Sequence, residues 1–108
     1  SVSSFADYVE TTTSTVETTI ATVDASVYRS ATFEVQAFNA TSGFYHKTLI
    51  SAIHNGTVAQ SVEYGVVAVN GACGTFAVTL SGNNLFLKVT STDANSTVYK
   101  IHSRLMKL

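Results

Sequence analysis

The sequence predicts an all-β protein: an antiparallel β-sandwich or jelly-roll-like fold of about seven strands, preceded by a short N-terminal arm. Thr, Val and Ile supply 34 of the 108 residues, and branching at Cβ favours strands over helices. Apolar and polar residues alternate along most segments, as they do in half-buried strands. Turn-forming residues separate these segments roughly every ten residues, a spacing typical of sandwiches and jelly rolls.

The chain is long enough for one domain, which buries roughly 60–70% of the surface exposed by the unfolded chain. We assign residues 1–10 to the N-terminal arm and residues 11–108 to the β-sandwich domain. The start of the chain lacks a basic and apolar signal segment, so we expect no signal-directed export.

The arm has its own apolar pattern. Phe5, Tyr8 and Val9 stand at i, i+3 and i+4 behind a possible N-cap, Ser4, which predicts a single helical turn. Such a turn is too short to be stable alone. The segment is therefore either a frayed terminus or an arm that docks on a neighbouring subunit, and in the second case Phe5, Tyr8 and Val9 form the subunit interface.

Two strands are predicted next. Residues 16–23 form the first of them, in which Val16, Thr18 and Ile20 alternate with polar or small residues. This pattern is typical of an edge strand. Residues 27–38 then form a strand that directs Val27, Ala31, Phe33, Val35 and Ala37 to the interior.

A long hairpin is predicted at the centre of the fold. Residues 44–54 and 57–69 flank Asn55-Gly56, a pair that favours the two-residue type I′ turn. In the second strand, Val58, Val62, Tyr64 and Val66 are expected to face inward. Gly65 predicts a bulge or tight bend.

Three further strands complete the fold. Residues 75–80 follow a turn at Asn70-Gly71, residues 85–90 follow a turn at 81–84, and residues 97–105 close the domain. The side chains expected to face inward are Phe76, Val78, Leu80, Leu85, Leu87, Val89, Tyr99, Ile101 and Leu105.

The charge pattern excludes several partners. Only 12% of residues are charged and the net charge is −1, so the chain lacks the basic surface that nucleic acid or an anionic membrane requires. The chain combines this low charge with 45% hydrophobic residues, a composition that favours an assembly in which much of the surface is covered. The lone Cys73 is expected to be a small buried residue rather than a disulfide or metal ligand.

No pattern of residues predicts catalysis. The acidic residues are scattered, and His46 and His54 lie about 27 Å apart along one strand, too far to share a metal. We therefore expect no enzyme activity, no metal and no cofactor. Phe44, Tyr45 and Phe86 lie near loops, where they serve either to stack on sugar rings or to pack in the core or an interface, and packing is the favoured alternative.

Five segments from Thr11 onward occur in the order of a known module. They read TTIATVDAS, VYRSATFEVQ, FYHKTLISAIHNGT, VEYGVV and GTFAVTLSGNNLFLKVT. Together they resemble a small structural module of tailed-bacteriophage virion proteins, notably those of contractile-tailed phages of marine cyanobacteria. One departure, His54-Asn55-Gly56 in place of His-Asp-Gly, retains the turn.

The resemblance implies a virion protein assembled in the host cytoplasm. It favours a capsid decoration or cement subunit, or otherwise a neck or tail accessory subunit, that forms homo-oligomers such as trimers and binds other virion proteins such as the major capsid protein. The alternative is a carbohydrate- or receptor-binding module of a tail fibre.

Overall fold

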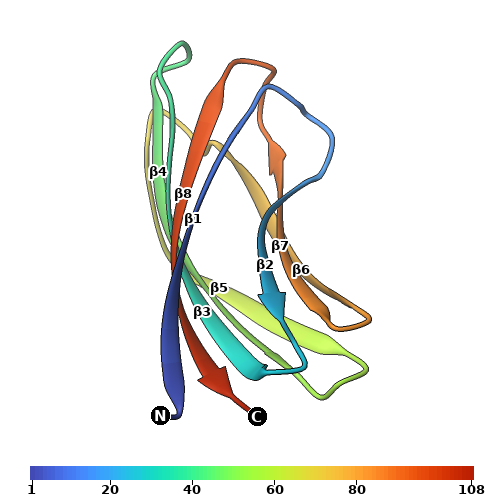
Figure 1. The fold of residues 1–108 in the computed structure, drawn as a ribbon. Coiled ribbons are helices and arrows are strands. Elements are labelled where there is room, and N and C mark those ends of the chain that lie inside the picture. Colours follow the sequence, from blue (N-terminus) through green and yellow to red (C-terminus); the bar gives the residue numbers. More distant parts are fainter.

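The computed structural model describes residues 1–108 and contains eight strands in two antiparallel sheets (Figure 1). The strands are β1 (Ser3–Thr12), β2 (Thr18–Asp24), β3 (Tyr28–Asn39), β4 (Phe44–His54), β5 (Ala59–Val69), β6 (Gly74–Ser81), β7 (Asn84–Ser91) and β8 (Thr97–Lys107). The predicted all-β sandwich is confirmed. Nowhere does the chain form a helix long and apolar enough to cross a lipid bilayer.

The two sheets differ in width. One has five strands in the order β1-β8-β3-β4-β5, and the other has three in the order β2-β7-β6. Strands β3, β4 and β5 run as an antiparallel meander within the larger sheet, a different arrangement from the two Greek keys of a jelly roll. Strand β2 is an edge strand, as expected, while β5 and β1 are the edges of the larger sheet.

The first ten residues form a strand, so the predicted helical turn is wrong. Strand β1 pairs with β8 over ten residue pairs, from Ser3 opposite Met106 to Thr12 opposite Thr97, and the two termini lie together at one end of the molecule (Figure 1). The boundary placed at residue 10 therefore falls inside β1. Pairing with β8 satisfies the backbone groups of the whole segment, which one helical turn could not do.

The core lies between the sheets, and most of its predicted members are confirmed. Phe33, Leu85, Leu87 and Tyr99 are fully buried. The other apolar residues buried between the sheets are Ile20, Ala21, Val23, Ala25, Ala31, Val35, Ala37, Ile50, Ala52, Cys73, Val89, Ile101 and Leu105. Phe76, Val78 and Leu80 of β6 are half-buried and pack against this cluster.

Tyr99 places a polar atom inside this core and satisfies it. Its hydroxyl lies 2.8 Å from the Ser91 hydroxyl and 3.2 Å from the Cys73 carbonyl oxygen, to which it donates. Burial raises the pKa of the Tyr99 hydroxyl, and the hydrogen bond with Ser91 opposes that shift. Burial also raises the pKa of the Cys73 thiol, which fits the expected small, inert, buried cysteine.

Two local details differ from the expectations. The hairpin between β4 and β5 is confirmed, but its type I′ turn is wrong because Gly56 has a positive φ of 94° and Asn55 does not. The connection between the strands is longer than two residues. The Asn55 side-chain oxygen stabilises it by accepting hydrogen bonds from the N–H groups of Thr57 and Val58. In β2, a bulge directs the side chains of both Ile20 and Ala21 into the core. The strict inward–outward alternation expected for this strand is therefore interrupted there.

Candidate functional site

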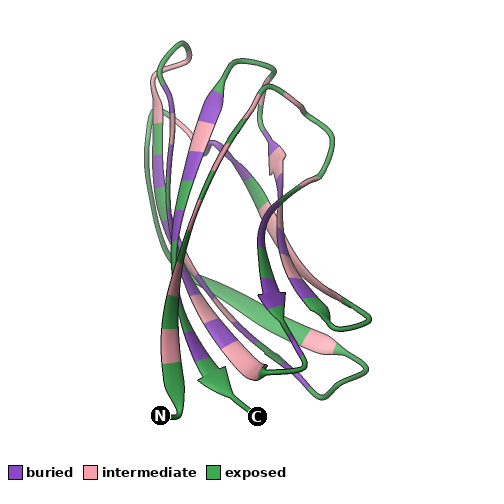
Figure 2. Cartoon of the chain, viewed as in Figure 1, coloured by how far each residue is buried: buried purple, intermediate pink, exposed green.

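Strand β5 is exposed along almost its whole length, as the colouring in Figure 2 shows. Val62, Tyr64 and Val67 are 60%, 46% and 65% exposed. The expected inward orientation of Val58, Val62, Tyr64 and Val66 is wrong, because all four are exposed. A contiguous run of large exposed apolar residues on an edge strand is a feature of binding and assembly surfaces.

The register of β5 on β4 explains this exposure. Val62 lies opposite Ser51 and Tyr64 opposite Leu49, which places both on the face turned away from the second sheet. Ser61, which lies opposite the buried Ala52, is also exposed. The smaller sheet therefore does not cover the inner side of β5, and both faces of this strand reach the surface.

A bulge at Gly65 changes the alternation within β5. The register shifts between Lys47 and Leu49 of β4, and Gly65 has a positive φ of 67°, so the predicted irregularity at this glycine is confirmed. With the extra residue, Tyr64 and Val67 lie on the same outer face although three positions separate them. A Cβ added at Gly65 would lie 3.1 Å from a methyl carbon of Leu49, which leaves little room for a side chain here.

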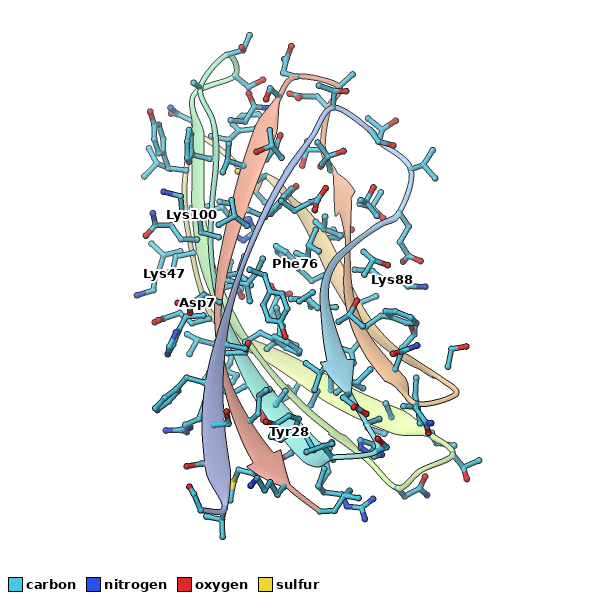
Figure 3. The ribbon with its side chains drawn as sticks, in the orientation of Figure 1. Asp7, Tyr28, Lys47, Phe76, Lys88 and Lys100 are labelled. Atoms are coloured by element: carbon cyan, nitrogen blue, oxygen red, sulfur yellow. The ribbon has the colours of Figure 1, made fainter.

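The outer face of the five-stranded sheet carries a shallow hollow of about 420 Å³. Its polar lining comes from β1, β3, β4 and β8 and consists of Asp7, Glu34, Gln36, Lys47, Lys100 and His102. These side chains meet because the strand register aligns Asp7 with His102 and Glu34 on one row. Figure 3 shows Asp7, Lys47 and Lys100 on this flank of the sheet, away from Phe76 between the sheets.

A second hollow of about 320 Å³ adjoins the first. The two share Gln36 and Lys47, and the apolar lining of the second comes from Ala37, Phe38, Tyr45, Val67 and Val69. The rings of Phe38 and Tyr45 stack with centroids 6.4 Å apart and an angle of 14° between their planes. Tyr45 is 53% exposed, so this aromatic pair is open to a ligand.

The charges in the first hollow are partly paired. His102 Nδ1 lies 2.6 Å from Asp7 Oδ1, and Lys47 Nζ lies 3.5 Å from Glu34 Oε2. Lys100 has no carboxylate within 4.0 Å of its ammonium group. The hollow therefore combines two paired carboxylates with one free cation.

The predicted interface residues Phe5, Tyr8 and Val9 do not share one face. Phe5 and Val9 lie on the outer face and are each 66% exposed, and Phe5 stacks on His102 with centroids 5.4 Å apart. Tyr8 points the other way, packs against the core, and donates a hydrogen bond of 3.1 Å to the Thr22 carbonyl oxygen. Burial raises the pKa of the Tyr8 hydroxyl. An interface role for the outer pair stays a prediction.

The three candidate sugar-stacking residues are also separated. Tyr45 lies in the second hollow, whereas Phe44 packs against the core and contacts the Gly71 region. Phe86 belongs to the smaller sheet, where Lys88 Nζ lies 5.6 Å from its ring centroid.

Sequence reasoning missed Phe38 and Lys100. Both residues stand at outward positions of the apolar–polar alternation, Phe38 in β3 and Lys100 in β8. These positions indicate a common surface only once the two strands are known to be neighbours.

Neither internal histidine offers an exposed side chain to these hollows, although His46 borders the second one. His46 is buried, and its Nδ1 accepts a hydrogen bond from the Cys73 N–H at 3.2 Å. Burial lowers the pKa of His46, and the charge of Glu63 opposes the shift. His54, at the far end of β4, is also buried, with its Nε2 lying 2.6 Å from the Tyr28 carbonyl oxygen. The other ring nitrogen of His46, Nε2, is buried without a hydrogen-bond partner, whereas His54 Nδ1 accepts a hydrogen bond from the Gly56 N–H at 3.0 Å.

The fold and these surfaces define a small β-sandwich with an exposed apolar edge strand and a grooved outer face, an arrangement suited to binding or assembly. No family model and no curated protein matches the chain. Among solved structures, it is similar to part of gp49, a tailspike protein and capsular polysaccharide depolymerase of the Acinetobacter baumannii bacteriophage Fri1. The TM-score is 0.51 at 12% identity, covering 98% of this chain and 19% of the tailspike. The likeness is one of fold, and the chain spans about a fifth of the tailspike's length.

Proposed function

We propose that this chain is a non-catalytic structural subunit of a tailed-phage virion, which adheres to copies of itself and to a neighbouring virion protein through strand β5. The observation that carries the proposal is the exposure of β5: Val62, Tyr64, Val66, Val67 and Val69 are all 46–65% exposed on one edge strand. In an isolated monomer this would be an aggregation hazard, because nothing covers its unpaired edge.

The chemistry of β5 suits adhesion. Its one charged residue is Glu63, whose carboxylate accepts a hydrogen bond from the buried Thr48 hydroxyl at 2.7 Å. The strand also lacks proline, which commonly blocks strand-to-strand pairing at an edge. A partner that covers these side chains gains apolar burial and, beside the bulge, backbone hydrogen bonds. A contact of about 800 Å² per partner is enough for a stable interface.

Two further findings support a phage origin. Five sequence segments resemble a virion module, and the fold is similar to part of a phage tailspike. In the leading form of the proposal, the chain is a capsid decoration or cement subunit that forms homo-oligomers, such as trimers, on the major capsid protein. In the other form, it is a neck or tail accessory subunit.

The test is the location of the chain in particles. We expect mass spectrometry of gradient-purified virions of the encoding phage to detect it in multiple copies, and immunogold labelling to place it on the particle surface. Gold over the head supports the capsid form, and gold below the head supports the neck or tail form. Absence of the chain from purified particles would overturn the proposal.

A second candidate function is a carbohydrate- or receptor-binding module of a tail fibre. The stacked Phe38 and Tyr45 rings beside a polar hollow favour it. The structurally similar tailspike is described as a capsular polysaccharide depolymerase, which adds support by analogy of fold. In this form, the gold label would lie at the fibre tips.

A further inference from the structure

We propose that the two hollows on the outer face of the five-stranded sheet form one continuous site for an acidic oligosaccharide, meaning a chain of sugar rings that carry carboxylate groups. The groove shares Val67 and Val69 with the β5 surface, but sugar binding is measured independently of the location of the chain in virions.

The two hollows are adjacent, and together they are long. The hollows share Gln36 and Lys47, and their combined lining extends from Val9 on β1 to Val69 on β5. Neighbouring strands lie about 4.8 Å apart, so a path across the five strands is about 19 Å long. This length accommodates several consecutive sugar rings, whereas a small metabolite would occupy only one of the hollows.

The lining changes along the groove in a way that suits a sugar chain. A pyranose ring has apolar C–H faces that pack on an aromatic surface, and the Phe38–Tyr45 pair provides such a surface at one end. At the other end, Asp7, Glu34 and Gln36 offer the acceptors and donors that ring hydroxyl groups require. An apolar partner would cover the Gln36 amide and the Lys100 ammonium group without offering either a hydrogen bond, at considerable cost in free energy.

The charged side chains of the groove favour a sugar that carries a carboxylate group. Asp7 and Glu34 are already paired with His102 and Lys47, but Lys100 has no acidic partner. A sugar carboxylate next to Lys100 would form a charge-assisted hydrogen bond that a neutral sugar cannot form.

The test is titration of the ¹⁵N-labelled chain with defined oligosaccharides, observed by NMR amide shifts. The acidic probes are tetragalacturonate and the α2,8-linked sialic acid tetramer, and the neutral probes are maltotetraose and xylotetraose. We expect at least one acidic probe to bind at least tenfold more tightly than the neutral ones and to shift the amides of β3, β4 and β8 around Gln36, Lys47 and Lys100. Added salt should reduce this preference.

Matched variants locate the site. Lys100→Gln should reduce affinity for the acidic probe about tenfold and abolish the preference over neutral sugars, while Tyr45→Ala should weaken both kinds of binding. Lys88→Gln and Phe86→Ala, the corresponding changes on the smaller sheet, should leave binding unchanged. Because Tyr45 and Lys100 are exposed on the surface, amide spectra of the variants should retain the native fold.

Three results would overturn the proposal: no binding of any probe at millimolar concentration, binding that survives both Lys100→Gln and Tyr45→Ala, or equal binding of neutral and acidic sugars. A fourth would identify a different occupant. If Tyr45→Ala abolished attachment to a purified virion protein while no sugar shifted the spectrum, the groove would be a protein-docking surface.

Discussion

The Thr48 hydroxyl, which is fully buried, donates a hydrogen bond of 2.7 Å to the carboxylate of Glu63, the one charged residue of strand β5. The bond connects β4 to β5 on the side that faces the second sheet. It holds the carboxylate away from the outer row formed by Val62, Tyr64 and Val67. The outer face of β5 is therefore free of charge, and this property is central to the proposed adhesion.

Glu63→Gln should strengthen self-association. A subunit that pairs along the β5 edge covers both faces of this strand, so it must also remove water from the Glu63 carboxylate on the inner side, which opposes contact. The amide has a smaller desolvation cost, and a gain of about 1 kcal/mol would increase the association constant roughly fivefold. Sedimentation equilibrium measures this change. Glu17→Gln makes the same change in net charge before β2 and should have no effect; equal effects of both variants would indicate a general charge effect instead.

Tyr99→Phe should destabilise the domain by about 1–3 kcal/mol. The change removes a buried hydroxyl that contacts Ser91 and the Cys73 carbonyl. It leaves the Ser91 hydroxyl without a partner, while the Cys73 carbonyl keeps the hydrogen bond from the Thr92 N–H. Urea unfolding followed by circular dichroism gives the free energy of unfolding. Tyr45→Phe, on the exposed outer face, should change it by less than about 0.5 kcal/mol. If the two variants were equally stable, the hydroxyl network would not contribute to stability.

The stability of the domain should fall below about pH 6.5, partly because of His46. Burial lowers the pKa of His46 in the folded protein, so between that pKa and about 6.5 the unfolded chain binds more protons than the folded one. The contribution of His46 is complete above about pH 6.5 and decreases as the pH falls toward the folded pKa. Thermal unfolding of the wild type and His46→Gln between pH 5 and 7.5 measures it. The variant should show the shallower dependence, and parallel curves would contradict this assignment.

Gly74→Ala should be more destabilising than Gly82→Ala. A Cβ at Gly74 would lie 2.7 Å from the Thr90 carbonyl oxygen and 2.9 Å from the Tyr99 hydroxyl, so β6 or β7 would have to move. Gly82 has open space around it and a positive φ of 57°, so alanine there costs only about 1–2 kcal/mol of backbone strain. Chemical unfolding of both variants tests the order. The reverse order would mean that β6 is free to shift.

Much of the fold follows from local sequence patterns. Strands β7 and β8 alternate strictly, so Leu85, Leu87 and Ile101 could be assigned to the interior from spacing alone. Glycine at position 65 likewise predicted the irregularity in β5, because few other residues adopt its conformation.

The other features depend on contacts between distant parts of the chain. Residues 3–12 become a strand because residues 97–106 lie beside them, and local spacing does not contain that information. The exposure of β5 depends on the second sheet having only three strands. The groove exists because β1, β8 and β3 are neighbours, so Asp7, Lys100 and Gln36 meet from three distant segments.

The most direct test of the central claim, adhesion through β5, is sedimentation velocity of the wild type and of Val62→Lys/Val67→Lys. Both valines are exposed, so the lysines should leave the folded monomer intact while placing charge on the adhesive row. We predict a concentration-dependent oligomer for the wild type, a monomer for the double variant, and wild-type behaviour for the control Thr19→Lys on β2, the edge of the smaller sheet. A wild type that remains monomeric at every concentration, or an oligomer unaffected by the two lysines, would contradict the account.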